Sequence, residues 1–318
     1  MRSVLMAGML LTIAKFIAFW MTHSNAILSD ALESIINIIA AGFGLYSISY
    51  ASQPKDDDHP YGHGKMEFLA VGFEGGLIFF TGIAMILKAV FSAFHPIPLQ
   101  RLDVGLWITA ITSFLNLLMG RYLLSKGKKL DSSTLVADGK HLIADTWSAF
   151  MIIAGIILMM VTGYHWIDVL MTIIMGFYIL IIGYKLVKDS LAGLMDEADF
   201  AKLEEIAKVL NTARKEHWID IHNLRVVKYG AHIHIDAHLT LPWYEDLEKS
   251  HQSVKEFEQI VNHHFGNKVE FFIHTDPCLP ISCAICAVQN CKVRKTPLVK
   301  QLKWDLPLLL KNKPHTAE

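Results

Sequence analysis

The chain has 318 residues, of which 53% are hydrophobic and 19% charged, and its mean hydropathy is +0.35. A soluble protein of this length is rarely so apolar, so the composition favours a membrane protein. The net charge of −1 and the lack of a basic arm with interleaved aromatic residues argue against nucleic-acid binding.

Apolar stretches dominate the first part of the chain, and each is long enough to cross the roughly 30 Å hydrocarbon core of a bilayer. They predict six transmembrane helices, over residues 3–21, 25–50, 66–93, 104–125, 134–162 and 166–188. The first stretch lacks a small-residue cleavage site, so we expect a retained helix and not a signal peptide. Basic residues concentrate in the second and fourth connections, which predicts a multi-pass protein of the cytoplasmic membrane with both termini in the cytoplasm.

Beyond about Met195 the pattern becomes that of a soluble domain. Amphipathic and alternating segments predict helix, strand, strand, helix and strand, over residues 200–215, 221–229, 232–241, 247–265 and 269–274. This order suits a small α+β domain with its helices on one face of a sheet. We therefore expect a membrane region, a soluble domain and a cysteine-rich, basic tail, over residues 1–190, 196–277 and 278–318. The tail either lies on the membrane surface or is solvated.

Two of the apolar stretches carry polar residues at the same spacing. Glu33 and Asn37 lie four residues apart on the second, and His141 and Asp145 on the fifth. Residues four apart share one helix face, and ionisable groups inside a membrane usually mark an ion path. Two carboxylates, an amide oxygen and an imidazole suit a divalent transition metal such as zinc better than calcium or magnesium. Polar contacts that only join the helices are the alternative.

An empty site of this kind would leave two carboxylates in a low dielectric, where their repulsion favours proton uptake. Exchange of metal against protons follows as a mechanism. Asp30 and Asp138 lie on the same two faces, one turn nearer the start of each helix. For them, helix capping, a water-lined entry and metal ligation all stay open.

The connection from Gln53 to Lys65 holds a second cluster of acidic residues and histidines. Proline and glycines prevent either flanking helix from continuing through it. His59 and His63 can close on one ion with an aspartate as third ligand, and a solvated turn is the alternative reading. The soluble domain carries further candidates on or just beyond its predicted elements, namely His222, His238, His251, His274 and Asp276. Spacing alone does not establish that they converge.

All four cysteines lie close together, at Cys278, Cys283, Cys286 and Cys291. Thiols this close can wrap one soft ion, and a cytoplasmic location argues against disulfides. A zinc site of four thiolates is the first prediction, with copper(I) or an iron–sulfur cluster behind it. Inert or palmitoylated cysteines are the alternative.

Residues 1–277 resemble the cation diffusion facilitator family. Besides the helices and the ligand pairs, the shared features are the loop Asp56-Asp57-x-His59-x-x-Gly62-His63-Gly64-Lys65 and the segments Trp166-Ile167-Asp168, Leu194-Met195-Asp196-Glu197 and His274-Thr275-Asp276-Pro277. The resemblance implies a homodimeric exporter of zinc, iron, manganese, cobalt or cadmium, driven by inward proton flow through alternating access. It also implies a ferredoxin-like, metallochaperone-like cytoplasmic domain that dimerises around bound metal.

Carried over by position, three sets of residues receive roles from this resemblance. Glu33, Asn37, His141 and Asp145 look like the transport site, and Asp56, His59 and His63 look like a loop site with the basic Lys65 beside it. His222, His238, His251, His274 and Asp276 look like regulatory sites. The chain departs from the family at Glu33 and Asn37, where members usually have His or Asp followed by Asp. The cysteine tail lies outside the resemblance.

The sequence thus predicts a proton-coupled exporter of a divalent metal ion, zinc or iron(II) before cobalt, cadmium or manganese, with the metal as both substrate and regulator. Its expected partners are a second copy of the chain, the lipid bilayer and protons, and not nucleic acid. An enzyme is not expected, because a membrane metallohydrolase needs an open metal position and a general base, and no His-Glu-x-x-His motif is present. A membrane sensor or scaffold that binds metal without transporting it is the alternative.

Overall fold

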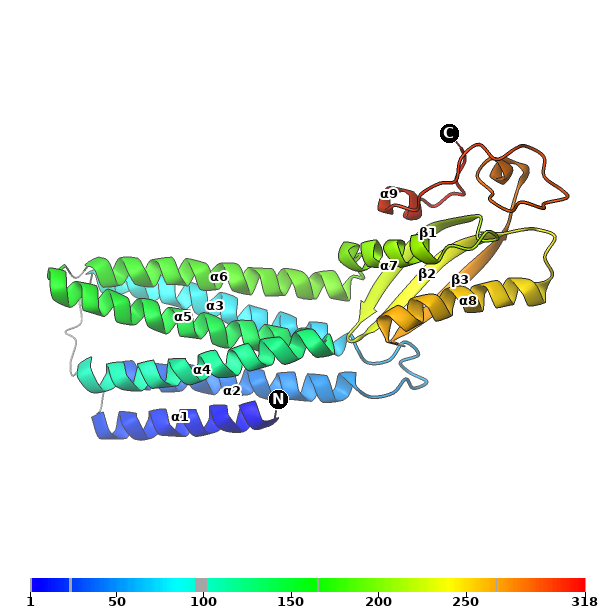
Figure 1. The fold of residues 1–318 in the computed structure, drawn as a ribbon. Coiled ribbons are helices and arrows are strands. Elements are labelled where there is room, and N and C mark those ends of the chain that lie inside the picture. Colours follow the sequence, from blue (N-terminus) through cyan, green and yellow to red (C-terminus); the bar gives the residue numbers. More distant parts are fainter. Residues whose placement is uncertain (1, 23–24, 95–101, 165, 267, 318) are drawn as a thin grey trace. The chain divides into compact units, whose positions relative to one another are not determined.

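The computed structural model describes residues 2–22, 25–94, 102–164, 166–266 and 268–317, without the side chains of some further helical residues (Figure 1). Its internal contacts divide the chain into two compact units, Met1–Met195 and Asp196–Glu318.

The first unit consists of long helices. They are α1 (Arg2–Thr22), α2 (Asn25–Ala51), α3 (Met66–Phe94), α4 (Leu102–Leu130), α5 (Ser133–Thr162) and α6 (Trp166–Leu194). A helix therefore covers each of the apolar stretches predicted from the sequence. Within the described residues, three segments are long and apolar enough to cross a membrane, namely Ser34–Ala51, Met66–Phe94 and Val169–Leu194.

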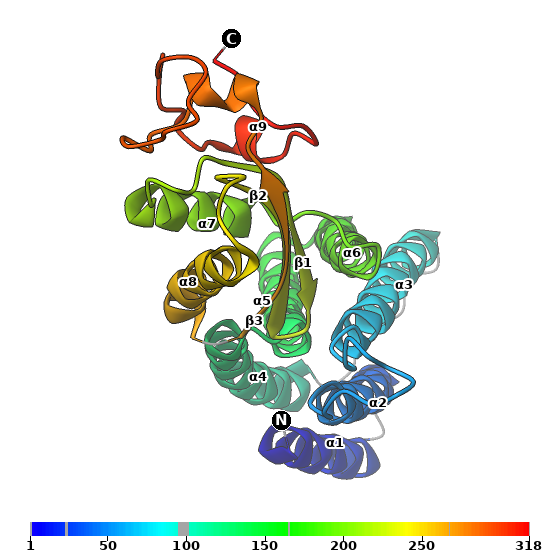
Figure 2. The ribbon, with the colours of Figure 1, turned by 90° about the vertical axis from the view of Figure 1, so that its right-hand side faces the viewer.

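Helices α3 and α6 pack closely along their length (Figures 1 and 2). Gly75 and Gly82 of α3 face Gly183 and Gly176 of α6, and a Cβ atom added at Gly183 would lie 2.5 Å from the backbone nitrogen of Phe79. Small residues at such a crossing let two backbones approach, which is a common way to join helices in a membrane. The glycines therefore fix this helix pair as one rigid element.

The second unit is a small α+β fold. Its elements are α7 (Phe200–Ala213), β1 (Asp220–Tyr229), β2 (His232–Leu241), α8 (Leu247–Phe265), β3 (Val269–Pro277), the 3-10 helix η1 (Pro280–Ala284) and the short α9 (Leu306–Leu309). The sheet has the order β1-β2-β3, with β1 and β2 antiparallel and β2 and β3 parallel. Gly230 makes the hairpin between β1 and β2 at φ 60°, a left-handed conformation that glycine adopts without strain.

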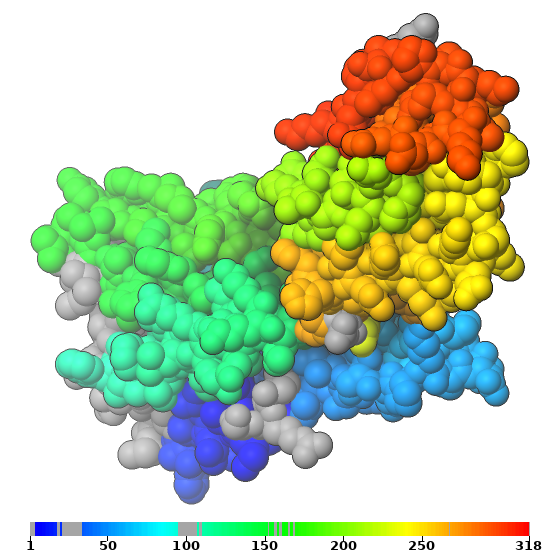
Figure 3. All heavy atoms as spheres, turned by 45° about the vertical axis from the view of Figure 1, so that its right-hand side comes forward, coloured from blue at the N-terminus to red at the C-terminus, as the bar shows by residue number. Residues whose placement is uncertain are grey.

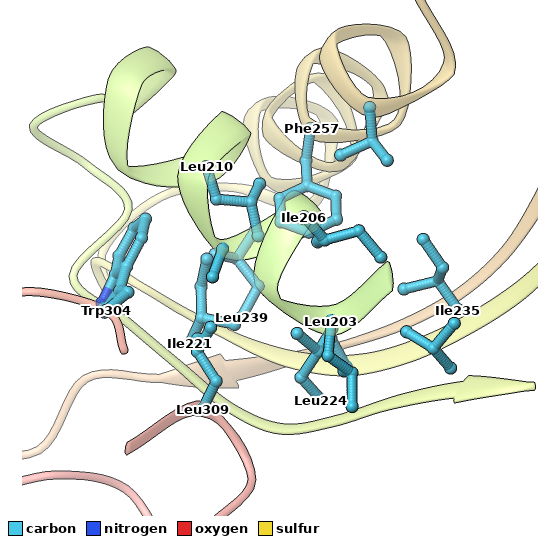
Figure 4. Close-up of a cluster of buried hydrophobic side chains, with 14 of the residues drawn as sticks. Leu203, Ile206, Leu210, Ile221, Leu224, Ile235, Leu239, Phe257, Trp304 and Leu309 are labelled. Atoms are coloured by element: carbon cyan, nitrogen blue, oxygen red, sulfur yellow. The ribbon is translucent and has the colours of Figure 1, made fainter. Parts of the chain in front are cut away.

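The core of this unit lies between the two amphipathic helices and one face of the sheet (Figure 4). Leu203 and Ile206 of α7 and Phe257 of α8 are fully buried there, against Ile221 of β1 and Leu239 of β2. The alternating pattern of β2 accounts for this arrangement, because its apolar residues face the helices and its histidines face the other way.

The residues after β3 are an integral part of this unit. Trp304 is buried in the same core, with the guanidinium of Arg214 3.9 Å above its ring. The side chain of Asn211 donates to Trp304 O at 2.6 Å and accepts from Trp304 N at 3.0 Å. Figure 3 shows the tail, in orange and red, packed against α7. Trp304 and Leu309 bury their apolar side chains in the domain core, so this part of the tail is packed and not solvated. That the rest of the tail lies on the membrane surface stays a prediction.

Candidate metal centres

Polar side chains of three helices meet inside the helical unit. Asn37 of α2 donates through Nδ2 to Asp145 Oδ2 of α5 at 3.1 Å. His141, one turn before Asp145, places Nε2 at 3.6 Å from Asp145 Oδ1. Its other ring nitrogen, Nδ1, lies 3.1 Å from Glu74 Oε1 of α3. The structure thus brings together three of the four residues predicted for the intramembrane site, and adds Glu74.

The remaining predicted residues of this site are differently placed. Glu33 and Asp30 belong to α2, but their side chains lie outside the described part of the structure. Asp138 is 6% exposed and lies inside α5, more than a turn beyond its start at Ser133, so it is not a helix cap. Among the described residues, its Oδ2 has no hydrogen-bond partner.

A cavity of about 70 Å³ adjoins these groups. Asn37, Glu74, Asp138 and His141 line it, together with the buried Lys15 of α1, whose Nζ donates to Ser34 Oγ at 2.8 Å. A cavity of this size is large enough for water or a small ion, and its lining holds both carboxylate and imidazole groups. The lining thus offers groups of the kind that bind cations, in a low-dielectric surrounding.

The second cluster lies in the loop between α2 and α3. Asp56 Oδ1 is 2.9 Å from His59 Nδ1, and Asp56 Oδ2 is 3.2 Å from His63 Nε2. The ligand atoms of these three residues all lie within 4.8 Å of one another. Burial acts to raise the pKa of Asp56, but hydrogen bonds from the side chain and backbone of His59 outweigh it and hold that pKa below its ordinary value. Lys65 points elsewhere, with Nζ 3.4 Å from Leu194 O.

The third cluster is set by the register of the sheet. His222, His238 and His274 are direct cross-strand partners on β1, β2 and β3, and Asp276 is level with Thr240 in the next row. Residues opposite one another in a sheet have Cβ atoms about 5 Å apart, so the three rings form a row on one face. His222 and His238 are separated by 5.0 Å between ring centroids, and His238 and His274 by 4.7 Å.

A β-bulge between His222 and Arg225 creates this alignment. The uninterrupted register from Tyr229 would place His222 opposite Leu239, which faces the core. Asn223, at φ 52°, takes up the extra residue and turns His222 to the outer face opposite His238.

Asp276 connects the row of histidines. Its Oδ2 lies 2.9 Å from His238 Nδ1 and 3.4 Å from His222 Nε2, and its Oδ1 lies 3.3 Å from His274 Nε2. The ligand atoms of His222, His238 and Asp276 lie within 4.8 Å of one another. The remaining predicted residue, His251, is exposed on α8 and belongs to neither of these ligand groups.

Two residues that the sequence analysis missed extend this cluster. Asp220 is 1% exposed in β1, and its Oδ2 lies 3.4 Å from His222 Nδ1. His315, near the end of the chain, places Nδ1 at 2.7 Å from Asp220 Oδ1. Burial acts to raise the pKa of Asp220, but the hydrogen bonds from His222 and His315 hold it well below its ordinary value.

The cysteines form a looser group around η1. All four are free thiols, Cys286 is buried, and Lys295 N lies 3.5 Å from Cys283 Sγ. The guanidinium of Arg294 donates to the carbonyls of Cys283, Cys286 and Val288, which ties the loop together. Burial raises the pKa of Cys278, and burial and the hydrogen bond with Cys291 raise the pKa of Tyr244 to about 12. Among the described residues, the ligand atoms that lie within 4.8 Å of one another belong to Asp56, His59 and His63 or to His222, His238 and Asp276, and neither group includes a cysteine.

The fold and these clusters define a membrane protein that handles metal cations, and comparison with known proteins names its family. A family model described as "Cation efflux transmembrane domain" matches residues 1–195, and one described as "Cation efflux protein, cytoplasmic domain" matches residues 198–278. The chain therefore belongs to the cation diffusion facilitator family of cation efflux transporters, as the resemblance predicted.

The relatives agree with this assignment. An uncharacterized transporter of Synechocystis, sll1263, is 30% identical over 248 residues, which cover 78% of this chain and 80% of the relative. The cation-efflux pump FieF of Salmonella typhi is 29% identical over 279 residues, covering 86% and 90%. FieF of Yersinia enterocolitica is 27% identical over 271 residues, covering 84% and 88%. The matches end at residue 278 in the cytoplasmic model, so most of the cysteine-containing tail lies beyond it.

Proposed function

We propose that this protein exports a divalent metal ion of zinc or iron(II) type across the cytoplasmic membrane, in exchange for protons. The observation that carries the proposal is the polar contact between α2 and α5, where Asn37 donates to Asp145 and Asp145 faces His141 beside a cavity. An imidazole, a carboxylate and an amide in one apolar bundle support a cation site, because such groups are costly in a membrane and usually mark an ion path.

In this proposal the ion is held by Glu33, Asn37, His141 and Asp145. Histidine favours zinc-like ions, while Asn37 contributes an oxygen without a charge. Asn37 donates from Nδ2 to Asp145 Oδ2, so an ion held by Asn37 would require the amide to present its oxygen instead. Departure of the ion leaves carboxylates in a low dielectric, and protons would then replace its charge.

The other clusters would serve the same transport cycle. Asp56, His59 and His63 would collect metal at the loop, and all six long helices would cross the bilayer with both termini in the cytoplasm. The row of His222, His238 and His274 with Asp276 would bind regulatory metal, and the exposed His274 would be available to a second copy of the chain. The cytoplasmic domain would thus form a homodimer whose geometry responds to metal.

The test is metal flux into proteoliposomes that contain the full chain, under an imposed pH gradient, with zinc, iron(II), manganese, cobalt and cadmium in competition. We expect flux for zinc or iron(II), abolished in Asp145→Ala and unchanged in Asp189→Ala, which removes an exposed carboxylate of α6. Undiminished flux in Asp145→Ala would reject the site.

A non-transporting metal sensor is the second candidate, and the neutral Asn37 is the observation that favours it. It predicts metal-dependent changes in dimer geometry without flux of any ion. Measurement of flux and of metal binding on the same vesicle preparation therefore distinguishes the transporter from the sensor.

A further inference from the structure

A buried carboxylate in α3 has no part in the ligand set just proposed. Glu74 is 4% exposed and lies within Met66–Phe94, one of the segments apolar enough to cross a membrane. A carboxylate at such a position is costly, and such residues usually face a partner inside the bundle. Glu74 contacts two residues of α5: His141, whose Nδ1 lies 3.1 Å from Glu74 Oε1, and the buried Asp138, which interacts with it side chain to side chain.

The two nitrogens of the His141 ring have different neighbours. Glu74 is 3.1 Å from Nδ1, within hydrogen-bond distance, and Asp145 is 3.6 Å from Nε2, beyond it. A neutral imidazole carries one N–H and one lone pair, and the hydrogen bond to one nitrogen decides which is which. When His141 donates its Nδ1 hydrogen to Glu74, Nε2 is the nitrogen that is left to bind an ion, and Nε2 is the one that faces Asp145.

This geometry separates the roles of the two carboxylates. Because they lie at opposite nitrogens of one ring, an ion bound to Nε2 beside Asp145 cannot use the oxygen of Glu74 that contacts Nδ1. A carboxylate that accepts the second N–H of a metal-binding histidine fixes its tautomer and makes it a stronger ligand. Glu74 also adds negative charge to a cavity that Asn37 lines without charge.

We propose that Glu74 is a positioning residue of the transport site, which orients His141 and sets its affinity for the ion from a helix that bears none of the four predicted ligands. This inference rests on the proposed function of that site. Since α3 is locked to α6 through glycines, Glu74 offers a fixed point against which the ring of His141 on α5 is held.

The experiment compares Glu74→Ala with Glu74→Gln in the full chain, by equilibrium zinc binding and by initial flux over a range of zinc concentrations. Loss of such a carboxylate typically costs about 10- to 100-fold in metal affinity. We expect Glu74→Ala to raise the KM for zinc within this range and to lower the maximal rate much less. Glutamine retains a carbonyl that accepts the Nδ1 hydrogen, so Glu74→Gln should lie between Glu74→Ala and the unaltered protein.

Glu67 supplies the matched control on the same helix. It is also buried, but it accepts hydrogen bonds from Ser132 Oγ at 2.6 Å and Thr134 N at 3.2 Å, at the turn between α4 and α5. Glu67→Gln should reduce the amount of folded protein without changing the KM. If Glu74→Ala behaves in this way, with flux lost in proportion to folded protein, the role of Glu74 is structural and the inference is wrong.

The outcomes distinguish this inference from the proposed function. Absence of flux in the unaltered protein would reject transport itself. Flux that Asp145→Ala abolishes, combined with an unchanged KM and zinc affinity in both Glu74 variants, would overturn the positioning role and leave transport standing. Should Glu74→Ala fail to fold, the graded effect of Glu74→Gln on KM alone decides.

Discussion

His315 Nδ1 lies 2.7 Å from Asp220 Oδ1, and the backbone amide of His315 donates to Asp220 Oδ2 at 2.9 Å. Both side chains are buried, although 95 residues separate them in the chain. Asp220 also faces His222, so the end of the tail is joined to the candidate metal site of the sheet through a single carboxylate.

Removal of this contact should loosen the first strand of the sheet. In His315→Ala, Asp220 would be buried with fewer hydrogen bonds, which typically costs about 1–3 kcal/mol. We expect faster amide hydrogen exchange in β1 of the metal-free protein, measured by mass spectrometry on the full chain. His251→Ala, which alters an exposed histidine of α8, is the control, and equal protection in both variants would contradict the prediction.

The middle histidine of the sheet row should be needed for metal binding by the cytoplasmic domain. His238→Ala removes a ligand that contacts Asp276 and neighbours His222. Loss of a group that only supports a metal ligand typically lowers metal affinity by about 10-fold or more, so loss of a ligand itself should lower zinc affinity by at least about tenfold. Calorimetry on the full chain with the transport site disabled by Asp145→Ala measures this. His232→Ala changes an exposed histidine on the same strand and should have no effect.

The tail cysteines should bind one soft ion. Four thiols, a buried Cys286 and a loop organised by Arg294 suit a zinc tetrathiolate, which draws the sulfurs together on binding. Cobalt(II) substituted for zinc should give thiolate-to-cobalt absorption, absent in Cys286→Ser and retained in His238→Ala. Acid-labile sulfide together with a visible chromophore would show that the site holds an iron–sulfur cluster and not zinc. Thiols that stay freely reactive in the presence of zinc would reject the site.

The close approach of α3 and α6 should tolerate no side chain at Gly183. An added Cβ would meet the backbone of Phe79, and overpacking of this kind typically costs about 1–3 kcal/mol. Gly183→Ala should therefore lower the midpoint of thermal unfolding in detergent. Gly76→Ala on α3 is the matched control, because no heavy atom lies within 4 Å of its added Cβ. Identical midpoints would show that the helices can separate without cost.

The apolar stretches were sufficient to predict where the helices lie, because hydropathy and length are local properties of the sequence. The spacing of His141 and Asp145 likewise predicted a shared face, since both belong to one helix. Glu74 could not be found in this way, because its partner lies on another helix and no periodic pattern connects them. The available signal was a carboxylate inside the apolar stretch 66–93, and Glu67 near the start of that stretch gives the same signal.

The histidines of the soluble domain illustrate a second limit. Alternation along β2 indicated which residues share a face, but the alignment of His222 with His238 depends on a one-residue bulge at Asn223. The position of His274 depends on parallel pairing after a helical crossover, and that of His315 on a tail without regular structure. None of these follows from spacing, because each is decided by contacts between distant segments.

The glycine contacts between α3 and α6 favour movement of these two helices as one body. Two backbones held this closely have no layer of flexible side chains between them that could absorb sliding. In the proposed transport cycle, a rearrangement that opens the site would therefore displace α2 and α5 against this pair. The contact between Glu74 and His141 crosses that boundary, so it would stretch or break as the access of the site changes, and its length would report the stage of the cycle.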